Sequence, residues 1–270
     1  MIKIKLYSQY SQFNNCVKSK YIRWTNEGKI EAYQDLFIPM AVDNKDNGKK
    51  KIALITEPRT IWNSAYKYDL GQYLQEHYDI FEYIFTFDPI LLQLPNAKPM
   101  PFVGVWSTND VKKDKNISMC CSNKAECEGH IKRQKIANQL KNKVDVLGNY
   151  FGKKRVSTKD IYSKYKYSIV LENEKDEWYF TEKVLNAFAN KCVPIYYGSP
   201  KILELFNPAG IIYVDNIEDI PKVLDILHPD DYISRIEAIK DNYNRVKKYQ
   251  CYEDYLYLTY KDELEGLWKY

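Results

Sequence analysis

The sequence contains no apolar run near the ~18 to 20 residues that a membrane-spanning helix needs. Residues 1–10 alternate isoleucine and leucine with lysine, which is the pattern of a half-buried strand and lacks the long apolar core of a signal peptide. Neither a membrane-spanning nor a secreted protein is therefore predicted. We expect a cytoplasmic protein that is at most peripheral to a membrane.

An excess of one charge sign is also missing. The 40 basic and 36 acidic residues give a formal charge of +4 and are spread along the chain, so nucleic-acid binding receives little support. Two short basic clusters, residues 45–51 and 111–115, stand beside Asp, Asn or Gly. Each is interpreted either as a solvated loop or as a phosphate- or membrane-binding patch.

A disulfide scaffold is excluded because the six cysteines are few and scattered, and we expect them to be reduced. Two interpretations are open for Cys120, Cys121, Cys127 and His130, namely a zinc site or buried thiols. Adjacent cysteines are not a standard zinc-ligand spacing, which favours buried thiols.

The sequence does have the composition of a folded globular protein, with 45% hydrophobic and 15% aromatic residues. Its 25 tyrosines suit sugar-binding surfaces, because tyrosine offers a flat apolar face and a hydroxyl. A compositional bias toward Tyr, Lys, Asn and Ile explains them equally well.

Strands and helices alternate along the chain, which predicts parallel sheets with ligands at the carboxyl ends of the strands. Three prolines between Leu91 and Pro101 exclude a regular helix or a central strand and mark a linker. We therefore predict an α/β protein of two Rossmann-like domains facing across a cleft, residues 1–104 and residues 105–270 with the C-terminal helices. Strands are expected in residues 1–10, 50–58, 83–89, 117–122, 144–148, 167–173, 193–198 and 210–216, and helices in residues 65–78, 129–142, 182–191 and most of the chain after residue 221.

The stretch VLENEKDEWYFTEK, residues 170–183, carries an unusual charge. A strand ends at Asn173, and a helix begins near Glu182 after Thr181 as a cap. Lys183 in the first helical turn is unfavourable beside the positive helix end unless an anion is close. Either Lys183 reaches solvent while Glu182 complements the helix dipole, or the helix start and Lys183 bind a phosphate or diphosphate.

Residues 167–200, from YSIVLEN through FTEK to VPIYYGSP, closely resemble the donor-binding signature of the α1,3/α1,4-fucosyltransferase family. The resemblance is looser over the rest of the second half and faint over the first half. It implies a GT-B fold, with an N-terminal acceptor-side domain and a C-terminal domain that binds a GDP-sugar. It also implies that Asn173, Tyr179 and Glu182 contact the ribose or fucose of GDP-fucose, and that Lys183 contacts its diphosphate.

Arg133 stands where the family places a phosphate-binding arginine ahead of a helix. Its planar guanidinium suits diphosphate oxygens, whereas the neighbouring Lys132 and Lys135 fit an ordinary solvated helix face. No Asp-X-Asp motif or His/carboxylate cluster lies near the signature. We therefore expect no cofactor, with fixed cations and not a metal neutralising the leaving diphosphate.

An inverting transfer needs a carboxylate that accepts the proton of the acceptor hydroxyl. Glu57 ends a predicted strand before Pro58, and the resembled family has a glutamate in a similar Glu-Ser-Pro turn, although the serine is absent here. Glu57 is the predicted base, with an ordinary strand-end carboxylate as the alternative. Arg59 is expected to hold Glu57 ionised or to bind an acidic acceptor.

The predicted function is transfer of L-fucose from GDP-fucose to a hydroxyl of an oligosaccharide or glycoconjugate acceptor, with inversion. Two alternatives stay open. One is a GT-B transferase that uses another nucleotide sugar, and the other is a glycan-binding protein of the same fold without catalytic activity.

Overall fold

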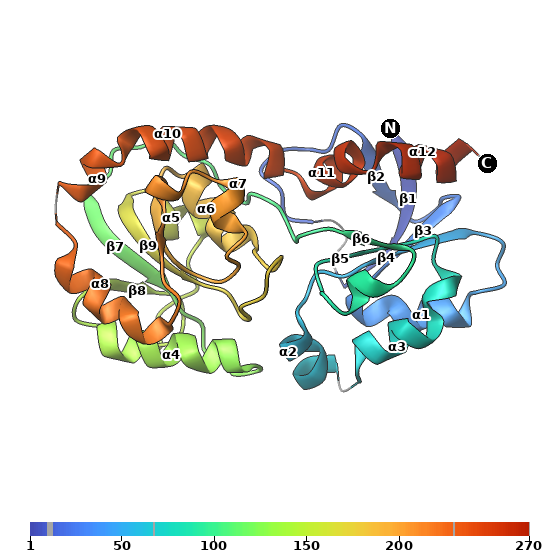
Figure 1. Cartoon of the computed structure of the whole chain (residues 1–270), viewed down its shortest axis with the longest axis horizontal. Coiled ribbons are helices and arrows are strands. Elements are labelled where there is room, and N and C mark those ends of the chain that lie inside the picture. Colours follow the sequence, from blue (N-terminus) through green and yellow to red (C-terminus); the bar gives the residue numbers. More distant parts are fainter. Residues whose placement is uncertain (10–12, 67, 229, 270) are drawn as a thin grey trace. The chain divides into compact units, whose positions relative to one another are not determined.

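The computed structural model describes residues 1–9, 13–66, 68–228 and 230–269. The chain divides into two compact units, Met1–Gly104 with Gln250–Tyr270, and Val105–Tyr249. Each unit contains a parallel sheet with helices on both faces, as the sequence predicted (Figure 1). Within the described ranges, no helix combines the length and the apolar character needed to cross a bilayer.

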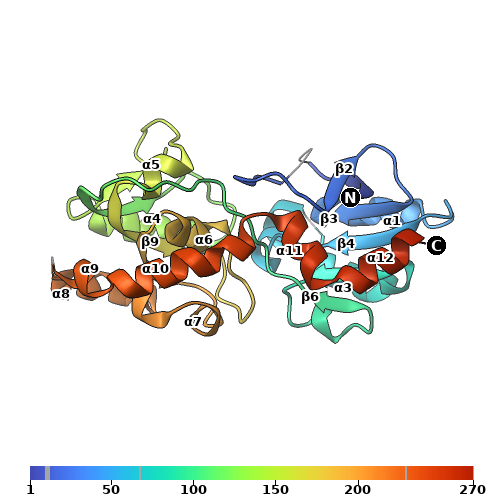
Figure 2. The same ribbon diagram turned by 90° about the horizontal axis from the view of Figure 1, so that it is seen from above.

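The first unit is built on a six-stranded sheet in the order β2-β1-β3-β4-β5-β6. Helices α1 and α3 cover one face, and α11 and α12 cover the other (Figure 2). Short helical turns at Asp35–Phe37, Trp62–Tyr66, Tyr78–Ile80 and Leu91–Gln93 complete the unit. The strands are β1 (Ile2–Tyr7), β2 (Ile22–Thr25), β3 (Ile30–Gln34), β4 (Lys50–Leu54), β5 (Tyr83–Thr86) and β6 (Ala97–Pro99), and the helices are α1 (Ile38–Asp43), α2 (Arg59–Ile61), α3 (Leu70–His77), α11 (Tyr252–Thr259) and α12 (Lys261–Lys269).

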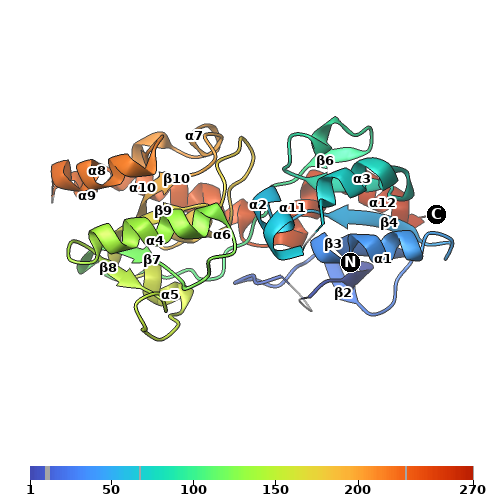
Figure 3. The same ribbon diagram turned by 90° about the horizontal axis from the view of Figure 1, so that it is seen from below.

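The second unit has a five-stranded sheet in the order β11-β10-β9-β7-β8. Figure 3 shows α4 lying across one face of this sheet, whereas α5, α6 and α10 lie on the other face (Figure 1). The strands are β7 (Lys115–Cys120), β8 (Asp145–Leu147), β9 (Tyr165–Leu171), β10 (Val193–Tyr197) and β11 (Ile212–Tyr213), and the helices are α4 (Glu128–Leu140), α5 (Thr158–Tyr162), α6 (Glu182–Ala189), α7 (Ile202–Leu205), α8 (Ile220–Ile226), α9 (Asp231–Ser234) and α10 (Ile236–Arg245).

Capping residues decide where two predicted helices begin. Helix α3 starts at Leu70 and not at residue 65, because the Asp69 side chain accepts a hydrogen bond from Gln72 N–H at 3.0 Å. Helix α6 starts after Thr181 as predicted, with the threonine hydroxyl accepting from Lys183 N–H at 3.3 Å. The proline-rich segment forms the short helical turn Leu91–Gln93 and β6, a short strand at the edge of the sheet, where a missing N–H is tolerated.

The C-terminal helices were predicted in the second domain, but they pack in the first unit. Glu253 on α11 accepts hydrogen bonds from the Trp24 indole on β2 and from the Asn15 amide, both at 2.6 Å. Tyr252 packs its ring against Phe13 at a centroid distance of 4.3 Å. These partners lie more than 200 residues away in sequence, so the periodicity of the helix could not indicate which sheet it covers.

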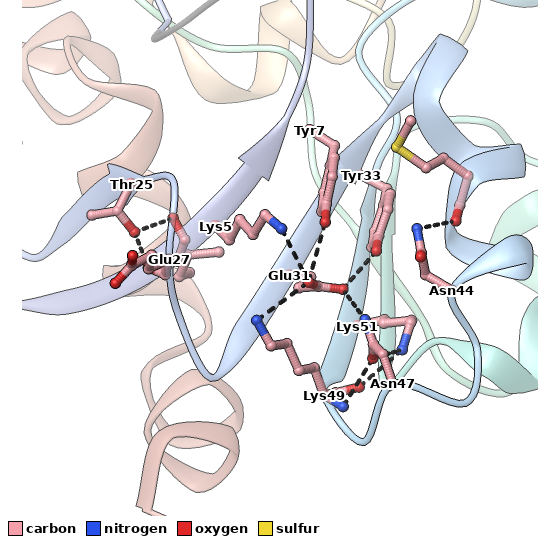
Figure 4. A network of polar contacts seen from close by, with 12 residues as sticks. Lys5, Tyr7, Thr25, Glu27, Glu31, Tyr33, Asn44, Asn47, Lys49 and Lys51 are labelled. Atoms are coloured by element: carbon pink, nitrogen blue, oxygen red, sulfur yellow. Dashed lines mark hydrogen bonds and ion pairs between the residues drawn. The ribbon is translucent and has the colours of Figure 1, made fainter.

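A buried carboxylate, Glu31 on β3, gathers charged groups at the amino end of the first sheet (Figure 4). Its oxygens accept hydrogen bonds from Tyr33 at 2.6 Å and Asn47 at 2.9 Å, and Lys49 lies at 3.6 Å. Burial raises the pKa of Glu31, but these partners outweigh burial and lower it below the ordinary value. Lys51, also in the 45–51 cluster, is 2% exposed and donates to Asn47 Oδ1. Lys51 of this basic cluster is therefore buried and belongs neither to a solvated loop nor to an open basic patch.

We expect Glu253→Gln to lower the free energy of unfolding of the first unit by about 1–3 kcal/mol, because an amide N–H₂ then faces the Trp24 or Asn15 donor and leaves a buried group without a partner. Urea unfolding followed by tryptophan fluorescence measures the change. Asp262→Asn, on the exposed surface of α12, is the matched control and should stay within about 0.5 kcal/mol of the parent. Equal effects of the two substitutions would contradict the docking role of Glu253.

Candidate functional site

Strands β7 and β9 are neighbours at the point where the strand order of the second sheet reverses. The chain continues from β7 to β8 on one side and from β9 to β10 on the other. In parallel sheets such a reversal opens a crevice beyond the carboxyl ends of the two strands, where ligands bind. Helix α4 follows β7 and α6 follows β9, so both begin at this edge. The predicted donor residues lie at these helix starts and beyond the end of β9.

The carboxylate of Glu172, directly after β9, organises the start of α6. Its fully buried side chain accepts hydrogen bonds from Thr181 N–H at 3.0 Å, Thr181 Oγ1 at 2.8 Å and Lys183 Nζ at 3.3 Å. Gly198 permits this packing, since a Cβ there would lie 2.7 Å from Glu172 Cγ. Lys183 also pairs with Glu182 at 3.4 Å. The negative charge that the lysine at this helix start needs is thus supplied within the protein, chiefly by Glu172.

Arg133 in α4 is 8% exposed. Its Nη2 donates to the Leu171 carbonyl oxygen at 2.6 Å and to Asn173 Oδ1 at 2.9 Å. The helix lies very close to β9 here, because a Cβ on Gly129 would lie 2.2 Å from the Asn173 carbonyl oxygen. Across the described ranges, no carboxylate lies within ion-pair distance of Arg133. Buried charges are normally paired, so this guanidinium is a candidate ligand for an anion.

The remaining predicted donor residues differ in exposure. Asn173 is partly exposed, and the Glu182 side chain is 13% exposed. Tyr179 is 1% exposed, and Phe180 after it is fully buried. The Tyr179 side chain is therefore enclosed in this structure. Its contact with the ribose or fucose of GDP-fucose stays a prediction.

The cysteine-rich segment before α4 does not form a zinc site. In the part of the chain that the structure describes, no group of three or more His, Cys, Asp or Glu side chains could hold a metal ion. Cys121 and Cys127 are buried free thiols, and burial raises the pKa of Cys121 to about 11. Catalysis without a metal stays a prediction.

In the first unit, Glu57 follows β4 at the carboxyl edge of the sheet. Asp35, directly after the neighbouring β3, holds this turn with one oxygen, which accepts Thr56 N–H at 2.9 Å and Glu57 N–H at 3.3 Å. Its other oxygen accepts the Thr56 hydroxyl. Burial raises the pKa of Asp35 to about 6, against the hydrogen bonds from Thr56 and Glu57. Asp35 also has a φ of 38°, which is uncommon for a residue other than glycine. Asp35, with a strained backbone and a buried carboxylate, therefore fixes the turn that carries Glu57.

Arg59, two residues after Glu57, makes a bidentate ion pair with Asp88 at 2.5 and 2.7 Å. The guanidinium also lies over the Trp62 ring, 5.3 Å from its centroid. Gly71 lies against it, since a Cβ there would lie 2.6 Å from Arg59 Nη1. Asp88 thus accepts from two nitrogens of the Arg59 guanidinium. The role of Arg59 toward Glu57 or an acidic acceptor stays a prediction.

A shallow hollow opens at the carboxyl edge of the first sheet, where the strand order reverses between β1 and β3. Ser8 after β1 donates to Gln34 at the end of β3, and Gln34 donates to Thr56 at 2.6 Å, so hydrogen bonds join three neighbouring strand ends. The hollow is lined by Gln9, Gln34, Asp35, Leu36, Phe37 and Tyr66.

Sequence reasoning missed two residues that shape these edges. Glu172 carried a readable signal, because a carboxylate ending an apolar strand beside Asn173 lies at the ligand-binding edge of a sheet. Asp35 carried none, because β3 itself was not predicted.

Comparison with known proteins gives the family. Residues 111–256 match the family model described as glycosyltransferase family 10 (fucosyltransferase), C-terminal. The chain is 31% identical over 81 residues to the α-(1,3)-fucosyltransferase FucT of Helicobacter pylori, and 32% identical over 87 residues to the putative fucosyltransferase R654 of Acanthamoeba polyphaga mimivirus. These matches cover 30% and 32% of this chain, but only 16% and 14% of the two relatives.

The fold has known counterparts. An α1,3-fucosyltransferase solved with GDP superimposes with a TM-score of 0.59 at 15% identity, covering 98% of this chain and 90% of the other. A mutant of TarM from S. aureus, solved with UDP among its ligands, gives a TM-score of 0.57 at 13% identity, covering 89% of this chain and 55% of the other. These likenesses establish the GT-B glycosyltransferase fold. Because the family model also spans more than half of the chain, including Arg133 and Lys183, the chain belongs to glycosyltransferase family 10, the fucosyltransferase family.

Proposed function

We propose that the protein transfers L-fucose from GDP-fucose to a glycan hydroxyl with inversion at the anomeric carbon. The observation that carries this proposal is the buried guanidinium of Arg133, which has no carboxylate partner among the described residues and lies at the reversal point of a parallel sheet. Such a cation suits a diphosphate. Membership of a fucosyltransferase family makes GDP-fucose the first donor to test.

The donor is held by two cations of different character. Arg133 presents a planar fork from the second turn of α4, whereas Lys183 presents a point charge that Glu172 already pairs. The α4 and α6 starts add partial positive charge. As the bond between fucose and phosphate breaks, negative charge grows on the leaving GDP, and fixed cations stabilise it without reorganisation. Asn173 and Glu182 supply side chains for sugar hydroxyls.

The acceptor hydroxyl loses its proton to Glu57 in a single displacement. The turn that carries Glu57 is fixed by Asp35, whose oxygen accepts two consecutive backbone N–H groups. A rigid turn favours a base that must meet one hydroxyl in one orientation. The acceptor class is a glycan.

Replacement of Arg133 tests the donor site. Arg133→Met keeps much of the side-chain volume but removes the charge and the fork, so the dissociation constant for GDP should rise at least about 30-fold, or about 2 kcal/mol. Isothermal titration measures it, with circular dichroism as the check on folding. Lys135→Met makes the same change on the exposed face of α4 and should leave the affinity unchanged. Parent-like GDP binding by the Arg133 variant would overturn the assignment.

Replacement of Glu57 tests the base. Glu57→Gln should lower kcat by about 10²- to 10⁴-fold, because the amide cannot accept the acceptor proton, while GDP affinity stays at the parent value. Donor consumption is measured with GDP-fucose, GDP-mannose and a UDP-sugar, each with a panel of glycan acceptors. Glu27→Gln, an exposed carboxylate of the same unit, is the control. If the Glu57→Gln protein transfers as fast as the parent, Glu57 is not the base. If the parent prefers a donor other than GDP-fucose, or shows no turnover, the proposed reaction is wrong.

A further inference from the structure

His130 lies in the first turn of α4, three residues before Arg133, so the two side chains share one helix face. It is 7% exposed, and its Nδ1 accepts a hydrogen bond from Glu126 N–H at 3.2 Å. That bond requires an unprotonated Nδ1 and therefore places the proton of the neutral ring on Nε2. Among the residues that the structure describes, none accepts a hydrogen bond from Nε2.

The charges around His130 keep its ring neutral. Burial, together with repulsion from Arg133 on the same helix, lowers the pKa of His130 to about 4. Glu126 opposes this shift, whereas Lys124 before α4 and Lys183 on α6 add to it. At neutral pH the site thus contains an uncharged N–H donor within the field of Arg133 and Lys183.

The position of this donor follows from the packing of the first turn of α4. Gly129, adjacent to His130, is pressed against the backbone of Asn173, and Arg133 reaches Leu171 and Asn173. The face that His130 shares with Arg133 therefore meets the carboxyl end of β9. A diphosphate has several acceptor oxygens. Arg133 and Lys183, which is already paired with Glu172, do not satisfy all of them, so a further hydrogen-bond donor can bind there.

We propose that His130 is a further ligand of the donor diphosphate, donating Nε2–H to a phosphate oxygen beside Arg133. This inference rests on the proposed donor site and adds a residue that the sequence resemblance did not assign. A bound diphosphate reverses the local field, because its negative charge favours imidazolium strongly enough to replace the hydrogen bond from Glu126 N–H, which a protonated Nδ1 can no longer accept. Nucleotide binding then takes up a proton at His130, and affinity rises as the pH falls toward the pKa of the free protein.

The test is the dissociation constant of GDP at pH 8.0, 6.5 and 5.5 for the full chain and for His130→Gln. Glutamine keeps an acceptor for Glu126 N–H and an N–H donor, so binding at pH 8.0 should stay within about threefold of the parent. In the parent, affinity should rise about tenfold more between pH 8.0 and 5.5 than in the variant, which corresponds to a bound-state pKa of about 6.5. GDP titrates its own phosphate equally in both proteins, so the difference isolates His130. His228→Gln, an exposed histidine of the same unit, should behave as the parent.

The outcomes separate the two proposals. If the parent and His130→Gln bind GDP with the same pH dependence, His130 is not a ligand while the donor site stands. If the parent does not bind GDP at any pH, both proposals fall. His130→Asn repeats the comparison where the glutamine variant does not fold, and a loss of the parent's extra pH dependence in either folded variant supports the inference.

Discussion

The charge of Arg133 is the constraint around which the second unit is arranged. A guanidinium removed from water is costly unless an anion or several oxygens replace its hydration. In this chain the main-chain carbonyl of Leu171, the last residue of β9, and the amide oxygen of Asn173 just beyond it partly do so. This arrangement depends on a glycine at residue 129, because any side chain there would push α4 away from β9.

The neighbouring cation is balanced differently. Lys183 has Glu172 beneath it and Glu182 beside it, so its charge is largely neutralised before any ligand arrives. The positive charge that has no carboxylate partner among the described residues at this edge is therefore that of Arg133 in α4. Because Glu172 also holds Thr181, the carboxylate fixes both the beginning of α6 and the place of the lysine ammonium. The same buried carboxylate thus holds the cap of α6 and positions the lysine proposed to bind the diphosphate.

The sequence predicted the α/β class, the strands of the second unit with its helices α4 and α6, and the edge where the donor residues gather, because these depend on local periodicity and on capping at Thr181. It did not predict the short helices α5 and α7. It missed β2 and β3, which are short and lie in a segment without a clear alternating pattern. It misplaced α11 and α12, because their partners on β2 are remote in sequence. The exposure of Tyr179 and the pairing of Arg59 with Asp88 also depend on three-dimensional packing, which residue types alone do not specify.

The first unit is made of two pieces of chain with the whole second unit between them. During synthesis, residues 105–249 are therefore available to fold before the first sheet receives α11 and α12. Until residues 250–269 have been made, the Trp24 indole and the Asn15 amide lack the Glu253 carboxylate that accepts their hydrogen bonds. A truncation that removes the last helices would consequently destabilise the first unit, although most of that unit is synthesised first. The segment around Trp24 is then the part left without its packing partner, and such exposed segments are what chaperones bind.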